Sequence, residues 1–473
     1  MVALDLRSLA LFRILLGLFT AGDALHRLID LRAFYQDSGA LPRSAITGEF
    51  ANHWELSLFL MSDALWWQVF LFALCALAGL AMAAGYRTWI ATFAGWLIVI
   101  SVQNRSEVIL DGGDMVQRLL LFWALFLPLG AIWSVESLRR ETPRRPWVLT
   151  AGSAALTIQM ISIFFFAALL KTGDPWRVNF NAVWYVMQWD VYITPVGVWM
   201  RQFPDVLRVL TVGTLIVEGL VPLLLLVPWA PVRVFAIGTL VSFHLGFLVA
   251  MKLFMFVSIM IAGWLSLTPG WLWDKLGVPL EMGETWKRRL ARWPSVEEWS
   301  PLSRWPWACN RIAALCLLYV LCWNIRSVYK PFERVFPHSL NFPGFTLRID
   351  QYWIMFAPSP VSEDGWFVVP GQLADGRIVD VFRDGAPVSW DRPESVANSY
   401  INRRWRRYLW TVTRSDSAAY RKYFAGYLCR EWDRRHAEVL ESLDIILMYE
   451  NSLPDLTVSP PQKMVLWQGQ KCH

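Results

Sequence analysis

Long apolar stretches with few charged residues recur along the first two thirds of the chain. An unpaired Lys, Arg or Asp at the centre of a bilayer costs about 3 kcal/mol, and a helix needs about 17 to 25 residues to cross it. On this basis nine spans are predicted, at 8–25, 64–86, 88–104, 119–135, 146–170, 209–232, 234–251, 253–273 and 305–325. The pattern predicts a polytopic α-helical membrane protein with about nine transmembrane helices.

The first of these spans differs from the others because Arg13 and Asp23 lie inside it. Ionisable residues in a span are expected to face protein or water. A signal peptide is the alternative, but Asp5 and Arg7 make a poor basic leader and no A-x-A cleavage site follows. The segment is therefore interpreted as a membrane helix.

Composition supports a membrane protein. Hydrophobic residues make up 55% of the chain and charged residues 17%, with a mean hydropathy of +0.36, which is more apolar than a soluble core requires. The 29 tryptophans suit the two membrane interfaces. The net charge of +6 comes from short basic clusters beside apolar stretches. We interpret these clusters as topology signals, with membrane lipid as a partner and no nucleic acid.

Two basic loops predict the orientation, because Lys and Arg in short loops are retained in the cytoplasm. They are 134–147, with four arginines, and 274–306, with six basic residues. With nine spans, both loops lie on the side of the N-terminus, which is then cytoplasmic. The predicted domains are a transmembrane helical domain at 1–326 and an extracytoplasmic α+β domain at 327–473.

The C-terminal part reads as a small soluble α+β domain. Asp375-Gly376 lies between two β-rich runs in 366–381 and predicts a hairpin. Helices are predicted at about 394–411 and 416–440. The second helix carries an aromatic stripe that is interpreted as core, formed by Tyr420, Tyr423, Phe424, Tyr427 and Trp432.

The first of these helices carries Arg403, Arg404, Arg406 and Arg407. The ordinary interpretation is a solvated helix face, and the alternative is a surface for an acidic substrate or anionic lipid.

The six cysteines indicate no metal site, because they form no CxxC pair or His/Cys cluster. Four of them are interpreted as small buried residues of the spans: Cys75, Cys309, Cys316 and Cys322. Cys429 and Cys472 fall in the tail, and the sequence leaves open whether they form a disulfide or stay as two free thiols.

Candidate chemistry lies where ionisable groups interrupt apolar helices, because such groups are costly unless they are paired or functional. A polar group at 103–118 contains Asn104, Arg105, Asp114 and Arg118. A second group at 171–177 contains Lys171, Asp174 and Trp176. Both fall at the outer face in the predicted topology and are expected to share a pocket. Glu218 and His244 lie inside the sixth and seventh spans.

Each of these residues also has a structural interpretation. Lys171 follows the apolar run 161–170, where desolvation favours a neutral amine that acts as a base. A lysine at the end of a membrane helix is otherwise a snorkelling anchor. His244 is ordinarily a hydrogen-bonded packing residue. The polar group at 103–118 is either a structural or a functional network.

Several fragments resemble the HTTM family, which is related to the vitamin K-dependent gamma-glutamyl carboxylases. They span most of the first 275 residues in the same order along the chain. The fragments are Asn104-Arg105-Ser106, Gly112-Gly113-Asp114, Leu120 to Pro128, Ala167 to Trp176, Val241 to His244 and Phe256 to Ile259.

The resemblance implies that Lys171 deprotonates a reduced quinone of the vitamin K hydroquinone or menaquinol type. Oxygen then generates a base strong enough to remove a γ-proton from a glutamate, and carbon dioxide captures the carbanion. Asn104, Arg105 and His244 are the other catalytic candidates. Substrate or cofactor binding is assigned to Asp114, Arg118, Asp174, Trp176 and Glu218.

The chain departs from the carboxylases at one catalytic position. Arg105 stands where the carboxylases have His, and a guanidinium cannot exchange a proton at neutral pH. Two interpretations follow: a carboxylase-like enzyme acting on a protein or small substrate, and a non-catalytic factor for maturation or export of a partner protein. A transporter is less favoured, because no internal repeat is visible.

Overall fold

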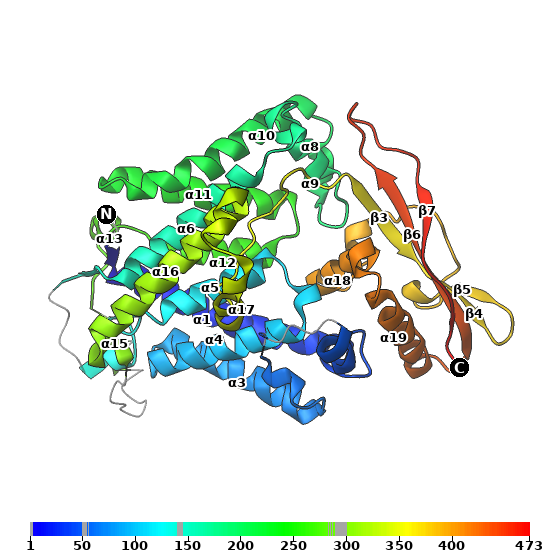
Figure 1. Ribbon diagram of the computed structural model, residues 1–473, viewed down its shortest axis with the longest axis horizontal. Helices are drawn as coiled ribbons and strands as arrows, with labels where there is room; N and C mark the ends of the chain where they lie inside the picture. The colour runs from blue at the N-terminus through cyan, green and yellow to red at the C-terminus, as the bar shows by residue number, and fades with distance from the viewer. Residues whose placement is uncertain are drawn as a thin grey trace.

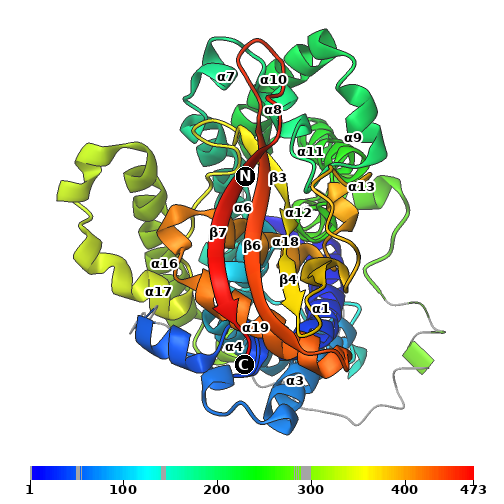
Figure 2. The ribbon, with the colours of Figure 1, turned by 90° about the vertical axis from the view of Figure 1, so that its right-hand side faces the viewer.

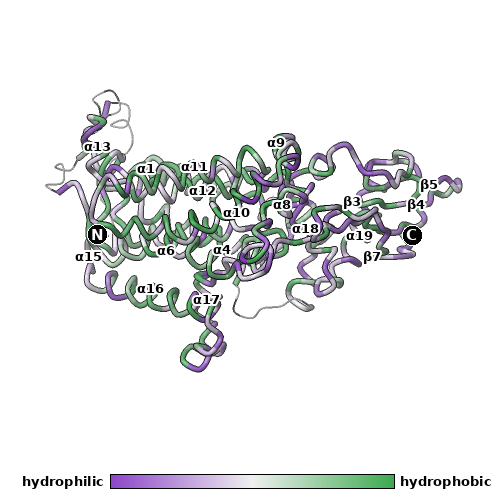
Figure 3. The backbone as a smooth tube through the Cα atoms, turned by 90° about the horizontal axis from the view of Figure 1, so that it is seen from above, coloured by the Kyte–Doolittle hydropathy of each residue, from purple (hydrophilic) through white to green (hydrophobic). Residues whose placement is uncertain are grey.

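The computed structural model describes residues 3–49, 54, 56–139, 145–281, 283, 285, 287, 288 and 300–473. It is mostly helical, with a small sheet at the C-terminal end of its long axis (Figure 1). Hydrophobic residues dominate the helical part, whereas the sheet-bearing part is mixed (Figure 3). The helices are α1 Leu6–Arg27, α2 Leu31–Tyr35, α3 Leu65–Ala84, α4 Thr88–Arg105, α5 Gly112–Ala124, α6 Ala151–Leu170, α7 Asp174–Arg177, α8 Ala182–Met187, α9 Pro195–Met200, α10 Pro204–Gly219, α11 Ala230–Ala250, α12 Phe254–Leu265, α13 Gly270–Lys275, α15 Pro301–Arg304, α16 Pro306–Val328, α17 Phe342–Leu347, α18 Arg403–Thr413 and α19 Tyr420–Arg435.

Six helical units among the described residues are long and apolar enough to cross a membrane. The chain is therefore a multi-pass membrane protein, but the predicted number of nine spans is not confirmed. The six units are Leu6–Tyr35, Leu65–Ala84, Ala151–Leu170, Pro204–Leu226, Ala230–Ala250 and Pro306–Val328.

The other three predicted spans are not among these six units, each for a local reason. The helix near 119–135 is α5, which begins earlier because Asp111 caps it and which ends at Ala124, before a turn at Pro128. The span at 253–273 divides into α12 and α13 on either side of Pro269. The third, 88–104, forms α4, whose last turn is polar.

Close packing of α1 against α3 depends on two glycines. A Cβ atom at Gly17 would lie 2.5 Å from the carbonyl oxygen of Gly79, and a Cβ atom at Gly79 would lie 2.6 Å from that of Gly17. Small residues let helix backbones approach closely where lipid gives no hydrophobic drive for association. These two helices therefore form a tight pair in the core.

The N-terminus lies at the end of the molecule opposite the sheet (Figure 1). Strand β1, Leu4–Asp5, pairs with β2, Trp147–Val148. Arg7 forms an ion pair of 2.8 Å with Asp274 of α13. The described ends of the two basic loops therefore lie beside the N-terminus. The assignment of this end to the cytoplasm stays a prediction.

The C-terminal sheet is built around the long strand β6, Leu440–Asn451. β3 Glu363–Val368 and β4 Pro370–Leu373 pair with successive parts of one side of β6, and β7 Gln462–Lys471 pairs with the other (Figure 2). β5 Ile378–Asp380 pairs with β4. The predicted hairpin at Asp375-Gly376 is confirmed, with Gly376 at φ +85°.

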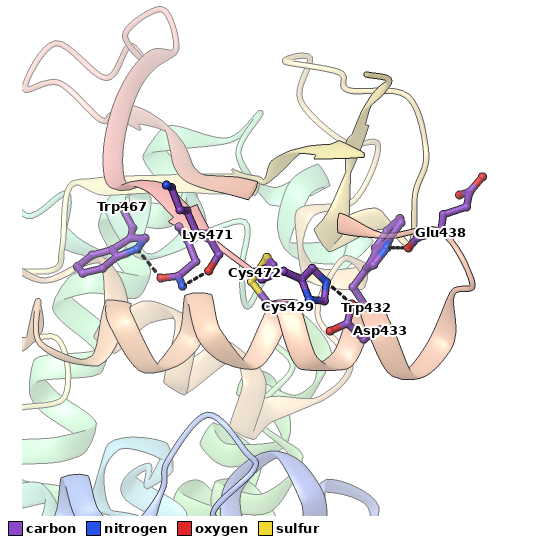
Figure 4. Close-up of a disulfide and its surroundings, with 9 residues drawn as sticks. Cys429, Trp432, Asp433, Glu438, Trp467, Lys471 and Cys472 are labelled. Atoms are coloured by element: carbon purple, nitrogen blue, oxygen red, sulfur yellow. Dashed lines mark hydrogen bonds and ion pairs between the residues drawn. A yellow bond between two sulfur atoms is a disulfide. The ribbon is translucent and has the colours of Figure 1, made fainter. Parts of the chain in front are cut away.

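Two helices connect this sheet to the membrane helices. The helix predicted from residue 394 begins only at Arg403, because Asn402 caps it by accepting hydrogen bonds from two backbone N–H groups. The second helix, α19, is bonded to the end of β7 through a Cys429–Cys472 disulfide (Figure 4). Phe424 and Trp432 of the aromatic stripe are buried as predicted, while its three tyrosines are half-buried. Cys75 is buried as predicted, but the other three free cysteines are half-buried.

Candidate functional site

Lys171 and Glu218 form a buried ion pair. Lys171 directly follows α6, and its Nζ atom lies 2.6 Å from Oε2 of Glu218. The two side chains are only 1% and 4% exposed. The ring centroid of Trp176 lies 5.2 Å from the same Nζ atom. An ammonium group, a carboxylate and an aromatic face thus meet out of contact with water.

The position of Glu218 follows from the pattern of α10. Its buried residues repeat at helical spacing, whereas its other faces are largely exposed. The buried residues are Leu207, Thr211, Thr214 and Glu218. This narrow stripe faces α6 and α8, so Glu218 is directed from α10 toward the end of α6.

The ion pair joins two candidate membrane spans, because Lys171 directly follows one of them and Glu218 lies within the other. Glu218 is near the middle of the unit Pro204–Leu226, which has the length of a full span. Residues after Lys171 fold behind α10, where the backbone N–H of Val183 bonds to Oγ1 of Thr211. The segment that follows Lys171 is largely exposed, whereas Lys171 itself is fully buried. The snorkelling interpretation of Lys171 is therefore wrong.

The neighbours of Lys171 in sequence have different surroundings. Trp176 is buried, and its indole N–H bonds to the carbonyl of Phe356 at 2.8 Å. Asp174 is exposed at the start of α7. Trp176 therefore belongs to the buried site, whereas Asp174 lies at the surface.

Asn104 and Arg105 end α4 but point to different partners. The amide oxygen of Asn104 accepts a hydrogen bond of 2.9 Å from Arg348, and its amide group donates to Leu56. Arg105 is fully buried and donates from Nη2 to the carbonyl of Leu41. Its Nε and Nη1 atoms have no hydrogen-bond partner among the described residues. Arg105 thus contacts the segment after α2, and Lys171 contacts α10.

Asp114 and Arg118 of α5 are held in ion pairs. Asp114 pairs with Arg27 at 2.5 Å and with Arg403 at 2.8 Å. Arg118 pairs with Asp350 at 2.8 Å. These residues therefore link α5 to α1, to α18 and to the segment 348–358.

An acid–arginine cluster joins α18 to the membrane helices. We use this name for Asp23, Asp30, Asp111, Asp114, Arg27, Arg403 and Arg404. Burial lowers the pKa of Arg404 and the nearby charge of Arg27 acts in the same direction, while Asp23 opposes both. The interpretation of the arginines as a solvated face is wrong for Arg403 and Arg404, which pair with the acids of this cluster, and for Arg406, which is buried against Val191. The sequence signal that could have indicated the cluster was Asp23, since a carboxylate inside a span needs a partner.

His244 lies in an aromatic environment on α11. Its Nδ1 atom is 2.6 Å from the carbonyl of Leu240, and its Nε2 atom has no partner among the described residues. The ring of Phe164 is 5.1 Å away, centroid to centroid, and that of Phe256 is 5.8 Å away. Phe164 is on α6, seven residues before Lys171, so His244 packs against the helix that carries the lysine.

The segment 348–358 connects the two predicted polar groups, and sequence reasoning missed it. Asp350 binds Arg118, and the carbonyl of Pro358 accepts a hydrogen bond from Gly173. Between them, Gln351 bonds to Gln159 near the middle of α6 at 2.9 Å. The structure thus brings together Lys171, Trp176 and Glu218. The segment 348–358 connects them to Arg118, while Arg105 and His244 have surroundings of their own.

Comparisons with family models, with curated proteins and with solved structures found no match to this chain.

Proposed function

We propose that the chain is a membrane enzyme of the carboxylase type, in which Lys171 is the base and Glu218 its proton partner. The observation that carries the proposal is the buried ion pair between them. A paired lysine and carboxylate inside an apolar bundle are costly to keep unless they are used or tightly held. The resemblance of the surrounding sequence to the HTTM family supports the same reaction type.

The pair provides a place for one proton to move. With the proton on Nζ, Lys171 is an ammonium and cannot accept another proton. Transfer of that proton to Oε2 of Glu218, 2.6 Å away, leaves a neutral amine beside a neutral acid. In an apolar site this transfer is less costly than in water, because desolvation disfavours both charges. The neutral amine is then the base.

One feature of the site suits a reduced quinone. Trp176 gives an aromatic wall beside the amine. When bound with oxygen, such a quinol would supply the strong base for removal of a carbon-bound proton, with carbon dioxide as co-substrate. Because Lys171 is closed to water, the quinol must approach from the lipid side, past α10.

A second function is favoured because the other candidate site residues have structural partners. Asn104, Asp114 and Arg118 have structural partners, and Asp114 holds α18 against the membrane helices. A non-catalytic factor for maturation or export of a partner protein would need only such a scaffold. In that case the Lys171–Glu218 pair would hold α6 to α10 and do nothing else.

The test is oxidation of a reduced naphthoquinone under oxygen by the purified protein, with analysis of the product for epoxide. The variants are Lys171→Met/Glu218→Leu, which removes both charges together, and Lys463→Met, which removes a lysine of β7 as the control. Activity in the wild type and in the control, but not in the folded double variant, supports the enzyme. Activity absent from the wild type with several quinols, or unchanged in the folded double variant, contradicts it.

A further inference from the structure

A pocket opens in the C-terminal domain between α18, α19 and residues 381–401. It encloses about 670 Å³ including its open mouth. Six aromatic residues contribute to its wall: Phe382, Tyr400, Trp405, Phe424, Tyr427 and Trp432. Concave sites with apolar, aromatic walls and a few polar groups are the usual form of a binding site.

The walls of this pocket are fixed by the fold. The ring of Trp405 packs on Phe34 of α2, with centroids 4.8 Å apart. On the other side, the disulfide between Cys429 and Cys472 fastens α19 to the end of the sheet, next to Trp432 (Figure 4). The site is therefore formed before any ligand arrives, which reduces the entropy cost of binding.

Three polar atoms of the lining have no hydrogen-bond partner among the described residues. They are the hydroxyl groups of Tyr400 and Tyr427 and the indole N–H of Trp405. Tyr400 and Trp405 are only 8% and 5% exposed. The polar ends of these side chains are open to the space of the pocket, where such groups usually bind a partner. An occupant with donors and acceptors beside an apolar group would supply these partners, whereas a hydrocarbon chain would not.

The charges at the mouth are already paired. Glu431 binds both Arg434 and Arg435, at 2.5 and 2.6 Å. Asp384 lies 3.1 Å from Nε2 of His436. The mouth therefore offers no surplus of one sign, which does not favour a strongly charged ligand such as a phosphate or a nucleic acid.

We propose that this pocket binds an apolar side chain of an extended peptide segment from a partner protein. The side chain enters between α18 and α19, and the adjoining peptide groups bond to Tyr400, Trp405 and Tyr427. The pocket is a recognition site whether or not the pair at Lys171 is catalytic. Both an enzyme with a protein substrate and a maturation factor could use it.

The probe is a set of nonapeptides of the form GSGSXSGSG, in which X is Phe, Leu, Ala or Glu. A photoreactive version carries benzoylphenylalanine at X and is irradiated with the full chain in lipid nanodiscs. Crosslinks are expected on α18 and α19, in competition with the Phe and Leu peptides but not with the Ala and Glu peptides. Loss of one hydrogen bond in Tyr400→Phe or Tyr427→Phe is expected to weaken competition by the Phe peptide about fivefold.

The matched variants are Ile401→Arg and Ile378→Arg. Both isoleucines are exposed in the C-terminal domain, but only Ile401 lines the pocket. Ile401→Arg should abolish the crosslinks and Ile378→Arg should leave them unchanged. The proposal is overturned if the crosslinks do not saturate, map outside the pocket or survive Ile401→Arg. It is also overturned if decanoate displaces the probe and the Phe peptide does not, since the site would then take a lipid chain.

Discussion

Arg404 of α18 donates a hydrogen bond of 2.7 Å from Nη2 to Oδ1 of Asp23, near the C-terminal end of the first membrane helix. The two side chains are 1% and 4% exposed. A residue of the C-terminal domain thus joins Arg27 of α1 in neutralising a buried carboxylate. The C-terminal domain and the helical bundle therefore stabilise each other at this surface.

We predict that Arg404→Met lowers the stability of the whole chain by about 1.5–3 kcal/mol, because it removes one of the three arginines that pair with the buried Asp23. Thermal unfolding in detergent measures the effect. The control is Arg414→Met, which breaks an exposed pair with Asp416 and should cost less than about 1 kcal/mol. Equal losses in the two variants would contradict the role of Arg404.

The buried pair at α6 gives a second prediction. Lys171→Met leaves Glu218 as an uncompensated buried acid and should cost about 3–5 kcal/mol. Lys171→Met/Glu218→Leu removes both charges and should recover most of that loss. Thermal unfolding of Lys171→Met, of Glu218→Leu and of the double variant gives the coupling energy between the two side chains. Additive effects would show that the two side chains do not depend on each other.

The sequence predicted the elements that depend on local pattern. Apolar runs with few charged residues located six membrane helices, and Asp375-Gly376 located a hairpin. It could not predict where α5 ends, because its helical pattern and the following apolar residues look alike until Pro128 turns the chain. Nor could it predict the partner of Asp23, since Arg404 lies 381 residues away and its neighbours suggest a solvated face.

The same limit applies to the candidate site. Glu218 and Lys171 were each visible as charges in apolar surroundings, but their pairing depends on how α10 packs on α6. The segment 348–358 gave no signal of its own. Its buried polar residues, Asp350 and Gln351, could not be identified from the sequence, because their partners Arg118 and Gln159 lie on helices that are distant in the sequence.

Orientation in the membrane follows from the basic loops and can be tested with single cysteines. Ile378→Cys and Leu276→Cys place exposed thiols at opposite ends of the molecule, in a background without the natural free cysteines. A membrane-impermeant maleimide should label residue 378 in intact cells and residue 276 only after permeabilisation, because basic loops stay in the cytoplasm. The reverse pattern would overturn the orientation and leave the fold unchanged.

The disulfide should stabilise the C-terminal domain. Cys429 and Cys472 are 43 residues apart, and closing a loop of this size typically contributes about 2–4 kcal/mol. A reducing agent should therefore lower the unfolding temperature of the wild type. Cys429→Ala/Cys472→Ala should already show the lower temperature and should not respond to the reducing agent. A response of the variant equal to that of the wild type would contradict this assignment.

Asp364 of β3 should make stability depend on pH. Burial raises the pKa of this carboxyl well above its ordinary value; the charge of Glu450 adds to the rise, while Arg201 and backbone hydrogen bonds oppose it. Its Oδ2 atom accepts a hydrogen bond from the N–H of Asp190, and its Oδ1 atom has no partner among the described residues. A raised pKa in the folded state means that the contribution is present near pH 4 and is lost as the pH rises through the folded pKa.

Asp364→Asn keeps an acceptor for the N–H of Asp190 and removes the titration. The difference in unfolding free energy between variant and wild type should be small near pH 4. It should then grow in favour of the variant by about 1.4 kcal/mol per pH unit, until the wild-type carboxyl has lost its proton. Denaturant unfolding at a series of pH values, followed by the fluorescence of the C-terminal domain, measures this difference. A difference that stays constant from pH 4 to pH 8 would show that Asp364 titrates alike in the folded and unfolded chain.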